Sequence, residues 1–295
     1  MGLAVALATH RPRPDIGPDR DLPELVRALG EAGAAARAVV WDDPDVDWGS
    51  YDLVVIRSTW DYIERVAEFT AWTEKVERLS ALANPARVIR WNADKRYLSD
   101  LVAAGVPTVP TAYAAPGDGC EAVLPEGEFV IKPTYGGGSH LAARYRPGEH
   151  AAARSHVARL HDEGLTAMAQ PYMRRIDTTG ERALLFFSGR FQHAIQKGAV
   201  LAPGVAFDAP KAAHPDVRAW HPTAAEREVA ERALAAVPGA PELLYARVDL
   251  VDGDDGAPRV MELELVEPNL FLGVHPHSLP VVAEQIVQSA GAGRP

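Results

Sequence analysis

The chain contains the segment FVIKPTYGGGS at residues 129–139, in which a short apolar run ends in Lys132 and leads into three successive glycines. Glycine lets backbone N–H groups approach an anion closely, and lysine supplies a point charge for a phosphate group. No Gly-Lys-Ser/Thr triplet follows the turn, so the segment is not a Walker A loop. Taken alone, the pattern fits a phosphate-binding loop and an ordinary β-hairpin turn equally well.

A second segment with a chemical pattern lies far downstream. The runs YARVDL at residues 245–250 and RVMELEL at residues 259–265 predict two strands joined by a glycine-containing turn. Glu262 and Glu264 are two residues apart and project from one strand face, and antiparallel pairing brings Asp249 beside them. Three carboxylates on one face repel each other unless a cation lies between them, and oxygen ligands suit Mg²⁺ or Mn²⁺. A solvated sheet face is the competing interpretation.

Residues 1–92 alternate short apolar runs with helical patterns. This alternation is typical of βαβ units and predicts an open, parallel α/β domain. The predicted strands are 3–9, 36–41, 53–58 and 88–91, and the predicted helices are 23–34 and 63–82.

Two further domains are predicted after this one. A helix over residues 92–105 stops before Pro107 and Pro110, which cannot continue it, and leads into a second domain, residues 93–170. Between residues 128 and 170 this domain has a strand, a glycine turn, a strand, a helix and a strand. The third domain, residues 171–295, is predicted to hold strands 183–187, 191–196, 245–251 and 258–265, helices 224–236 and 281–290, and a mobile loop over the active site at 202–222.

Composition and charge narrow the class of protein. A net charge of −10 argues against a nucleic-acid partner, because binding to a phosphate backbone needs basic patches. No apolar run reaches the length of a membrane span and the N-terminal residues lack the basic start of a signal peptide, so we expect a cytoplasmic protein with no membrane partner. The lone cysteine, Cys120, rules out an internal disulfide framework and is expected to be a bystander. A homodimer is compatible with the sequence.

The lysine-glycine segment and the carboxylate segment together resemble the ATP-grasp family. The resemblance extends over residues 1–290, in the domain order of glutathione synthetase and D-alanyl-D-alanine ligase. It implies an α/β protein in which an N-terminal open parallel-sheet domain is followed by two α+β domains that enclose ATP. Members of this family activate a carboxylate as an acyl phosphate, so the resemblance implies an enzyme that uses ATP with Mg²⁺ or Mn²⁺.

The resemblance also implies roles for individual residues. Arg247 and Lys132 are the implied catalytic residues, which offset charge on the transferred phosphoryl group, and Asp249, Glu262 and Glu264 are the implied metal ligands. Glu264 stands where most of the family has asparagine, which adds negative charge to the metal site. The residues implied in nucleotide binding are Lys95, Lys132, Tyr135, Gly136, Gly137, Gly138, Ser139, Gln170, Pro171, Tyr172, Met173 and Glu181.

Candidate substrate residues follow the predicted strand 53–58. Arg57, Ser58 and Thr59 lie at the carboxyl edge of a parallel sheet, where open α/β sheets bind ligands. The guanidinium of Arg57 can hold a substrate carboxylate through two parallel hydrogen bonds. A salt bridge between Arg57 and an acidic neighbour such as Asp61 is the alternative interpretation.

Further candidate substrate residues lie in the C-terminal half. His193 and Lys197 are four residues apart on a predicted strand, so they share a face that points into the nucleotide cleft or forms a surface pair. Asn269 is placed to reach the substrate. His275 and His277 lack a cysteine or a third histidine at ligand spacing, so we do not expect a metal there.

Within the ATP-grasp family, three segments look most like the branch that contains O-ureido-D-serine cyclo-ligase: VIRSTWDY at 55–62, FFSGRFQHAIQK at 186–197 and ELELVEPNLF at 262–271. This finer resemblance implies ring closure of a small amino-acid-like substrate, O-ureido-D-serine, to the antibiotic D-cycloserine. An intermolecular carboxylate-amine ligase fits the same motifs. A nucleotide-sensing protein without turnover is a second alternative, but ATP binding alone would tolerate loss of one of the three carboxylates.

Overall fold

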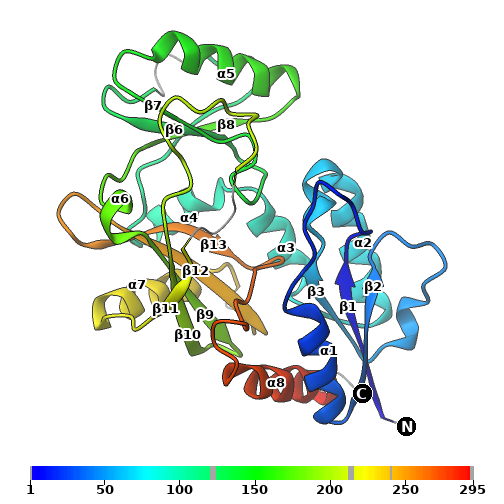
Figure 1. Cartoon of the computed structure of the whole chain (residues 1–295). Helices are drawn as coiled ribbons and strands as arrows, with labels where there is room; N and C mark the ends of the chain where they lie inside the picture. The colour runs from blue at the N-terminus through cyan, green and yellow to red at the C-terminus, as the bar shows by residue number, and fades with distance from the viewer. Residues whose placement is uncertain (1, 120–123, 212–215, 240, 293–295) are drawn as a thin grey trace.

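Three β-sheets organise the chain in the computed structural model, which describes residues 2–119, 124–211, 216–239 and 241–292. Figure 1 shows the second sheet above the third and the first sheet beside the third. None of the helices in these described ranges is long and apolar enough to cross a membrane. Cys120 and residues 212–215 of the predicted mobile loop lie outside the described residues.

The first sheet is parallel, with strand order β2-β1-β3-β4. Val5 and Leu7 pack with helices α1 and α8, whereas Ala6 and Ala8 pack with α2, so β1 is buried on both faces as a central parallel strand requires. The elements are β1 Leu3–Thr9, α1 Leu22–Glu31, β2 Ala34–Val40, a 3-10 turn at Trp48–Ser50, β3 Leu53–Ser58, a second 3-10 turn at Trp60–Glu64, α2 Val66–Leu79, β4 Ala81–Ala83 and the C-terminal α8 Ser278–Ala292.

The predicted strand at residues 88–91 is wrong, because these residues belong to helix α3, Ala86–Ala93. The buried residues Ala86, Ile89 and Ala93 recur at helical spacing and face the core. The short apolar run that suggested a strand is therefore part of one helix face.

Two predicted helices in this region are longer than the observed ones. The helix predicted at 63–82 ends at Leu79, because Ser80 adopts an extended backbone and the following residues pair with β3 as strand β4. The helix predicted at 92–105 is reduced to α4, Tyr97–Ala103.

The second sheet is antiparallel, with strand order β5-β8-β6-β7. Phe129 and Ile131 of β6 pack against Val157 and Leu160 of helix α5, which covers one face. The predicted succession of strand, glycine turn, strand, helix and strand is confirmed. The elements are β5 Ala112–Ala114, β6 Phe129–Pro133, β7 Ala143–Tyr145, α5 His150–Asp162 and β8 Ala167–Pro171.

The third sheet is antiparallel, with strand order β11-β10-β9-β12-β13. The loop predicted at 202–222 is wrong over its last part, because Arg218–Trp220 forms strand β11 and pairs with β10. The other elements are α6 Ile176–Thr179, β9 Glu181–Phe187, β10 Arg190–Lys197, α7 Ala224–Ala235, β12 Tyr245–Asp252 and β13 Pro258–Glu264.

The two faces of the third sheet differ in chemistry. One face is apolar, and its residues Phe186 and Val248 pack with Ala230 of α7. The other face is apolar at one end, where Leu185 and Phe187 join the core that includes α8, and polar at the end that turns toward the second sheet. The predicted domain boundaries after residues 92 and 170 stay predictions.

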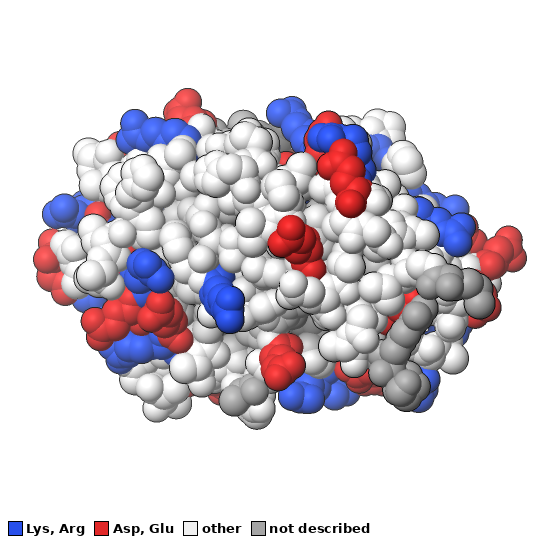
Figure 2. All heavy atoms as spheres, turned by 90° about the horizontal axis from the view of Figure 1, so that it is seen from below, with Lys and Arg blue, Asp and Glu red and all other residues white. Residues whose placement is uncertain are grey.

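On the face that Figure 2 shows, the Lys and Arg side chains are scattered, several of them beside Asp or Glu side chains, and most of that face is uncharged. Binding of a phosphate backbone needs clustered basic residues. This face therefore does not offer a surface suited to nucleic acid.

Candidate active site

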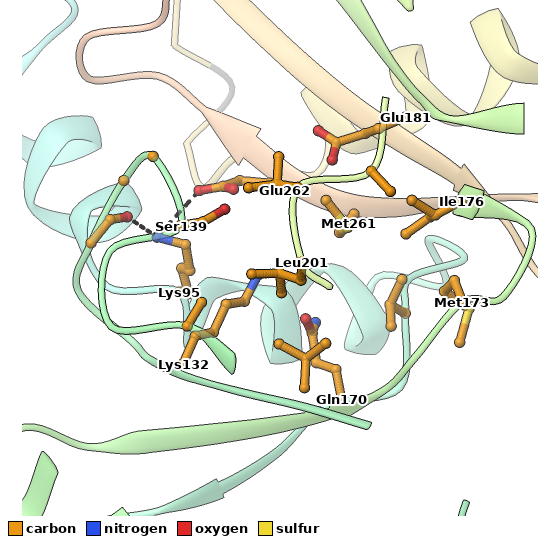
Figure 3. Close-up of a pocket in the computed structure, with 18 of the residues that line it drawn as sticks. Lys95, Lys132, Ser139, Gln170, Met173, Ile176, Glu181, Leu201, Met261 and Glu262 are labelled. Atoms are coloured by element: carbon orange, nitrogen blue, oxygen red, sulfur yellow. Dashed lines mark hydrogen bonds and ion pairs between the residues drawn. The ribbon is translucent and has the colours of Figure 1, made fainter. Parts of the chain in front are cut away.

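A cavity lies between the second sheet and the polar end of the third sheet. Its wall combines β6 and the glycine segment after it, β8, and side chains from β9, β10, β12 and β13. Figure 3 shows Lys95 and Lys132 reaching into this cavity from the side of the glycine segment, with Glu181 and Glu262 on the opposite wall. Segments far apart in the sequence thus build one site.

Two lysines stand at the mouth of the glycine segment. Lys95 lies in the turn between α3 and α4; its N–H donates to the Thr134 carbonyl (2.9 Å), and its Nζ bonds the Gly136 carbonyl and lies 3.2 Å from Glu262 Oε1. Lys132 lies on β6, and burial lowers its pKa. A desolvated ammonium gains strongly from a nearby anion, which is what a phosphate group supplies.

The glycine segment has backbone conformations that side chains rarely adopt. Gly136 has φ 152°, Gly138 has φ 59° and even Ser139 has φ 61°, in the left-handed region. All three residues line the cavity, together with Gly137. Tyr135 does not line it; its hydroxyl-bearing ring packs toward the first sheet instead.

Part of the cavity wall is lined mainly by apolar side chains. Gln170, Pro171, Tyr172 and Met173, the predicted hinge, all line it. The other apolar residues of the cavity wall include Val109, Val130, Ile176, Leu201 and Met261. The sequence analysis missed these residues, because single apolar residues in strands and loops look the same as ordinary core residues.

Lys197 and Arg247 surround the carboxylate of Asp249. Arg247 donates to both oxygens, with Nε 2.8 Å from Oδ1 and Nη2 2.9 Å from Oδ2, and Lys197 Nζ lies 2.9 Å from Oδ2. Burial opposes ionisation of Asp249, but these two cations lower its pKa overall. Lys197 also lies 2.5 Å from Glu181 Oε1, and its pKa is raised by both carboxylates in spite of its burial.

The three predicted metal ligands come together. Each of Asp249, Glu262 and Glu264 offers a carboxylate oxygen, and these oxygens all lie within 4.8 Å of one another. Asp249 pairs with Glu262 in the register of β12 and β13, and a bulge at Met261 shifts the pairing directly beyond them. Bulges next to active sites re-aim side chains, and here Met261 and Glu262 both reach the cavity.

The two glutamates of β13 differ in electrostatic environment. Burial opposes ionisation of Glu262, but Lys95 and Lys132 lower its pKa. Burial raises the pKa of Glu264, although Arg247 donates a hydrogen bond to its Oε1. An added divalent cation would favour the ionised form of Glu264, so the donor set fits a hard metal ion.

Arg57 is 2% exposed and is engaged within the protein. Its Nη1 donates to the Pro268 carbonyl (2.6 Å) and its Nε lies 3.1 Å from Asp19 Oδ2. The alternative interpretation, a salt bridge to an acidic neighbour, is therefore confirmed, with Asp19 rather than Asp61 as the partner. The Asp61 carboxylate accepts from Trp41 Nε1 (2.9 Å) and lies 2.8 Å from Arg65. Arg57 thus ties the first sheet to the segment that follows β13.

Three other candidate substrate residues lie near Arg57 in the chain or beside its partner Pro268, and not on the wall of the cavity. Ser58 Oγ lies 2.9 Å from Thr9 Oγ1, and Thr59 Oγ1 is buried and lacks a hydrogen-bond partner among the described residues. Asn269 Oδ1 accepts from the Phe271 N–H (3.1 Å). These residues lie outside the cavity wall.

His193 and Lys197 lie in different places in the structure. Lys197 lines the cavity, whereas His193 Nε2 donates to the Leu270 carbonyl (2.8 Å) and its ring stacks on His275 at 4.6 Å. His277 meets His275 edge-on at 5.5 Å. Burial lowers the pKa of His193 to about 4, so this ring is neutral at pH 7.

Comparisons with known proteins show the family and the fold of the chain. The family model of the D-cycloserine synthetase DcsG N-terminal domain matches residues 5–84. The chain is 41% identical over 269 residues to the cycloserine biosynthesis protein DcsG of Streptomyces lavendulae, covering 86% of this chain and 88% of that protein. The crystal structure of D-cycloserine synthetase DcsG matches with a TM-score of 0.85 at 37% identity, over 99% of this chain and 100% of that one.

A more distant structure shares the fold alone. D-alanine–D-alanine ligase of Bacillus anthracis complexed with ATP matches with a TM-score of 0.67 at 13% identity, over 98% of each chain. Fold and site together define an ATP-grasp ligase, as the sequence predicts. Within that class, the chain belongs to the family of D-cycloserine synthetase DcsG.

Proposed function

We propose that this enzyme uses Mg-ATP to cyclise O-ureido-D-serine to D-cycloserine. The observation that carries the proposal is the 41% identity to a cycloserine biosynthesis protein over most of both chains. The grouping of two lysines, a glycine segment and three carboxylates around one cavity supports it, because these are the parts that phosphoryl transfer to a carboxylate needs.

The nucleotide is proposed to lie along the cavity. Its base fits the apolar end near Met173 and Met261, and its phosphates fit the end formed by Lys95, Lys132 and the glycine segment. Closure of the glycine segment over the phosphates would exclude water, which protects an acyl phosphate from hydrolysis.

The metal is proposed to be held by Asp249, Glu262 and Glu264, whose oxygens suit Mg²⁺ or Mn²⁺. When bound, such an ion neutralises charge on the phosphate oxygens. Arg247 lies beside Asp249 and Glu264 and is placed to offset charge that develops on the transferred phosphoryl group.

The reaction then has three steps. A carboxylate oxygen of the substrate attacks the γ-phosphorus, and ADP leaves. The ureido nitrogen that is bound to oxygen attacks the acyl carbon and loses its proton, so that the ring closes and phosphate leaves. Water then removes the carbamoyl group as carbon dioxide and ammonia. Nucleophile and acyl phosphate belong to one molecule, so the protein has only to hold the substrate in a bent conformation for ring closure.

The test supplies O-ureido-D-serine and Mg-ATP as the only small molecules. Mass spectrometry should find D-cycloserine, and ADP should form in equal amount. The L-isomer should react poorly, because a chiral site that holds the D-isomer in the conformation for ring closure does not hold its enantiomer in the same way. A variant with Glu262→Gln serves as the control for ADP released by contaminating enzymes.

An intermolecular carboxylate-amine ligase would give a different result. ADP would then form only after a separate amine is added, and the product would be an amide rather than a ring. Absence of ADP formation with every amino-acid-like carboxylate would instead favour a nucleotide-binding protein without turnover. The cytoplasmic location and the homodimer stay predictions.

A further inference from the structure

The strand that carries Glu262 and Glu264 is an edge strand. In the third sheet β13 pairs with β12 on one side and is the last strand on the other. An edge strand leaves a row of backbone N–H and C=O groups without a neighbouring strand. Val260, Leu263 and Leu265 at this edge are buried, so their backbone groups need other hydrogen-bond partners.

The first part of that edge is held by backbone. The Val109 N–H donates to the Val260 carbonyl (2.9 Å), and the Val260 N–H donates to the Pro107 carbonyl (2.8 Å). The bulge at Met261 follows directly. Among the described residues, no strand pairs with this edge beyond that point.

The part of the edge beyond the bulge is held by side chains. Asn92 Nδ2 donates to the Leu263 carbonyl (2.8 Å), and Asn92 Oδ1 accepts from the Leu265 N–H (2.7 Å). The Leu263 N–H donates to the Tyr97 hydroxyl (2.8 Å). The amide of Asn92 therefore does the work of a neighbouring peptide group and spans the backbone on both sides of Glu264.

Both side chains are shielded from water, with Asn92 5% and Tyr97 3% exposed. Water cannot replace a bond lost at such a depth, so removal of either group leaves a buried backbone group unsatisfied. The strand can relieve this only by moving, and Glu264 lies between the two backbone groups that Asn92 holds.

Asn92 and Tyr97 also flank Lys95. Asn92 lies near the end of α3, Tyr97 begins α4, and the turn between them places Lys95 Nζ 3.2 Å from Glu262 Oε1. Residues 92–97 thus place the Lys95 cation in the site and also hydrogen-bond to β13, the strand that carries Glu262 and Glu264. The distance between Lys95 Nζ and Glu262 Oε1 therefore depends on the hydrogen bonds that Asn92 and Tyr97 make to β13.

We propose that Asn92 is a positioning residue for the metal site, and that the hydrogen bond of Tyr97 to the Leu263 N–H contributes to the same positioning. Its amide fixes β13 at Glu264 and so sets the spacing of Glu262 and Glu264 relative to Asp249 and Lys95. The proposal rests on the proposed function, because it takes the three carboxylates as metal ligands.

Mn²⁺ is the probe for the test, because its free aquo ion can be counted by electron paramagnetic resonance while the protein is titrated. Asn92→Ala removes both bonds to β13 and should raise the dissociation constant of Mn²⁺ about tenfold, the size of effect seen for residues one step removed from metal ligands. Tyr97→Phe removes one bond, keeps the ring in place and should give a smaller rise in the same direction.

Asn84 provides the matched control. It is fully buried and holds the same sheet through the Tyr245 and Leu265 carbonyls (2.9 and 2.8 Å) and the Leu244 N–H (2.9 Å). Unlike Asn92, it bonds β13 only on the side of Leu265 away from Glu264 and makes no bond to Leu263 between the two glutamates. Asn84→Ala should lower the melting temperature at least as much as Asn92→Ala. It should leave the Mn²⁺ dissociation constant within about twofold of the wild-type value.

Three outcomes would overturn the proposal. Mn²⁺ affinity could be unchanged in Asn92→Ala in spite of a lower melting temperature, or it could fall equally in Asn84→Ala, which would mean general loosening of the sheet. If Asn92→Ala does not fold, unchanged Mn²⁺ affinity in Tyr97→Phe overturns it. A wild-type protein that does not bind Mn²⁺ would instead contradict the metal site of the proposed function.

Discussion

Lys197 and Asp249 form a buried ion pair in which Nζ lies 2.9 Å from Oδ2, at the centre of the predicted metal site. Arg247 bonds both oxygens of the same carboxylate. In this arrangement the ammonium of Lys197 is paired with Asp249 Oδ2, one of the oxygens that a divalent ion would use. Metal binding at Asp249 therefore has to displace Lys197 or share the oxygen with it.

The first prediction concerns this pair. Lys197→Met keeps an unbranched side chain, one atom shorter, but leaves Asp249 and Glu181 with one cation fewer, and breaking a buried ion pair typically costs about 3–5 kcal/mol. We expect the free energy of unfolding to fall by about that amount without metal, as measured in urea. Added Mg²⁺ should recover more stability in the variant than in the wild-type protein, because an ion that binds only the folded state stabilises it.

The control for this prediction is Lys75→Met, since Lys75 is exposed on α2 far from the site. Its free energy of unfolding should change by less than about 0.5 kcal/mol. An equal response of Lys197→Met and wild-type protein to Mg²⁺ would show that Lys197 and the metal do not compete for Asp249.

The second prediction concerns Lys132, which is half-buried at the end of the cavity proposed for the phosphates and whose pKa is lowered by desolvation. Lys132→Ala should weaken ATP binding by about 1.5–3 kcal/mol, the range of a hydrogen bond to a charged group. Isothermal titration calorimetry with a non-hydrolysable ATP analogue measures this directly. Unchanged affinity for the analogue would remove Lys132 from the nucleotide site.

The third prediction concerns the metal requirement. Glu262→Gln keeps the shape of the side chain but replaces an anionic ligand by a neutral amide, and we expect the Mg²⁺ concentration for half-maximal ADP release to rise about tenfold or more. Glu264→Asn introduces the asparagine that the family resemblance implies at this position, and it should raise that Mg²⁺ concentration less. The metal assignment fails if neither variant changes the Mg²⁺ dependence.

The fourth prediction concerns stability at acid pH. Burial lowers the pKa of His156 to about 4, and its ring stacks on Phe207 at 4.3 Å beneath α5. An unfolded histidine has a pKa near 6.5, so between about pH 6.5 and 4 the unfolded state binds more protons and the protein loses stability as pH falls. His156 should account for about 1–2 kcal/mol of the loss between pH 7 and pH 5.

The measurement is the free energy of unfolding at pH 7 and at pH 5 for the wild-type protein and His156→Phe. The difference between the two pH values should be smaller in the variant by the amount given above. His140 is exposed, and His140→Ala should leave the difference as it is in the wild-type protein. Identical pH dependence in His156→Phe and wild type would contradict the neutral, buried state of His156.

The parts of the site that could be predicted from the sequence are those with a local pattern. Lys132 precedes its glycines directly, and Glu262 and Glu264 share a face because strand side chains alternate. The resemblance to one family joined these local patterns into a site. The structure confirms that their side chains meet around one cavity.

The parts that could not be predicted depend on contacts between distant segments. Nothing near Lys197 in the sequence indicates that it pairs with Asp249, because the pairing of β9 with both β10 and β12 creates that contact. Asn92 looks like an ordinary polar residue of a helix until β13 lies against it. The predicted strand at 88–91 failed for a related reason, since a short apolar run fits a strand and a helix face equally well.

The last prediction concerns the substrate side. If Arg57 holds the substrate carboxylate, Arg57→Ala should raise the KM of the carboxylate substrate about 10- to 100-fold, as expected for loss of a charged hydrogen bond, and should change the KM of ATP much less. Steady-state ADP release with each substrate varied in turn measures both constants. Equal rises in the two constants would indicate a general loss of structure.

The structure makes a sharper comparison available, because Arg57 is already engaged by Asp19 and by the Pro268 carbonyl. Asp19→Asn removes the nearer of two competing carboxylates, since Asp21 Oδ2 lies 3.8 Å from Arg57 Nη2, and leaves the bond to Pro268. A guanidinium that binds substrate should then bind it equally well or more tightly. A guanidinium that serves only to tie the first sheet to the segment after β13 has no such gain. Substrate KM should therefore stay level or fall in Asp19→Asn while it rises in Arg57→Ala, and a similar rise in both variants would make the Arg57–Asp19 pair a structural element rather than a substrate clamp.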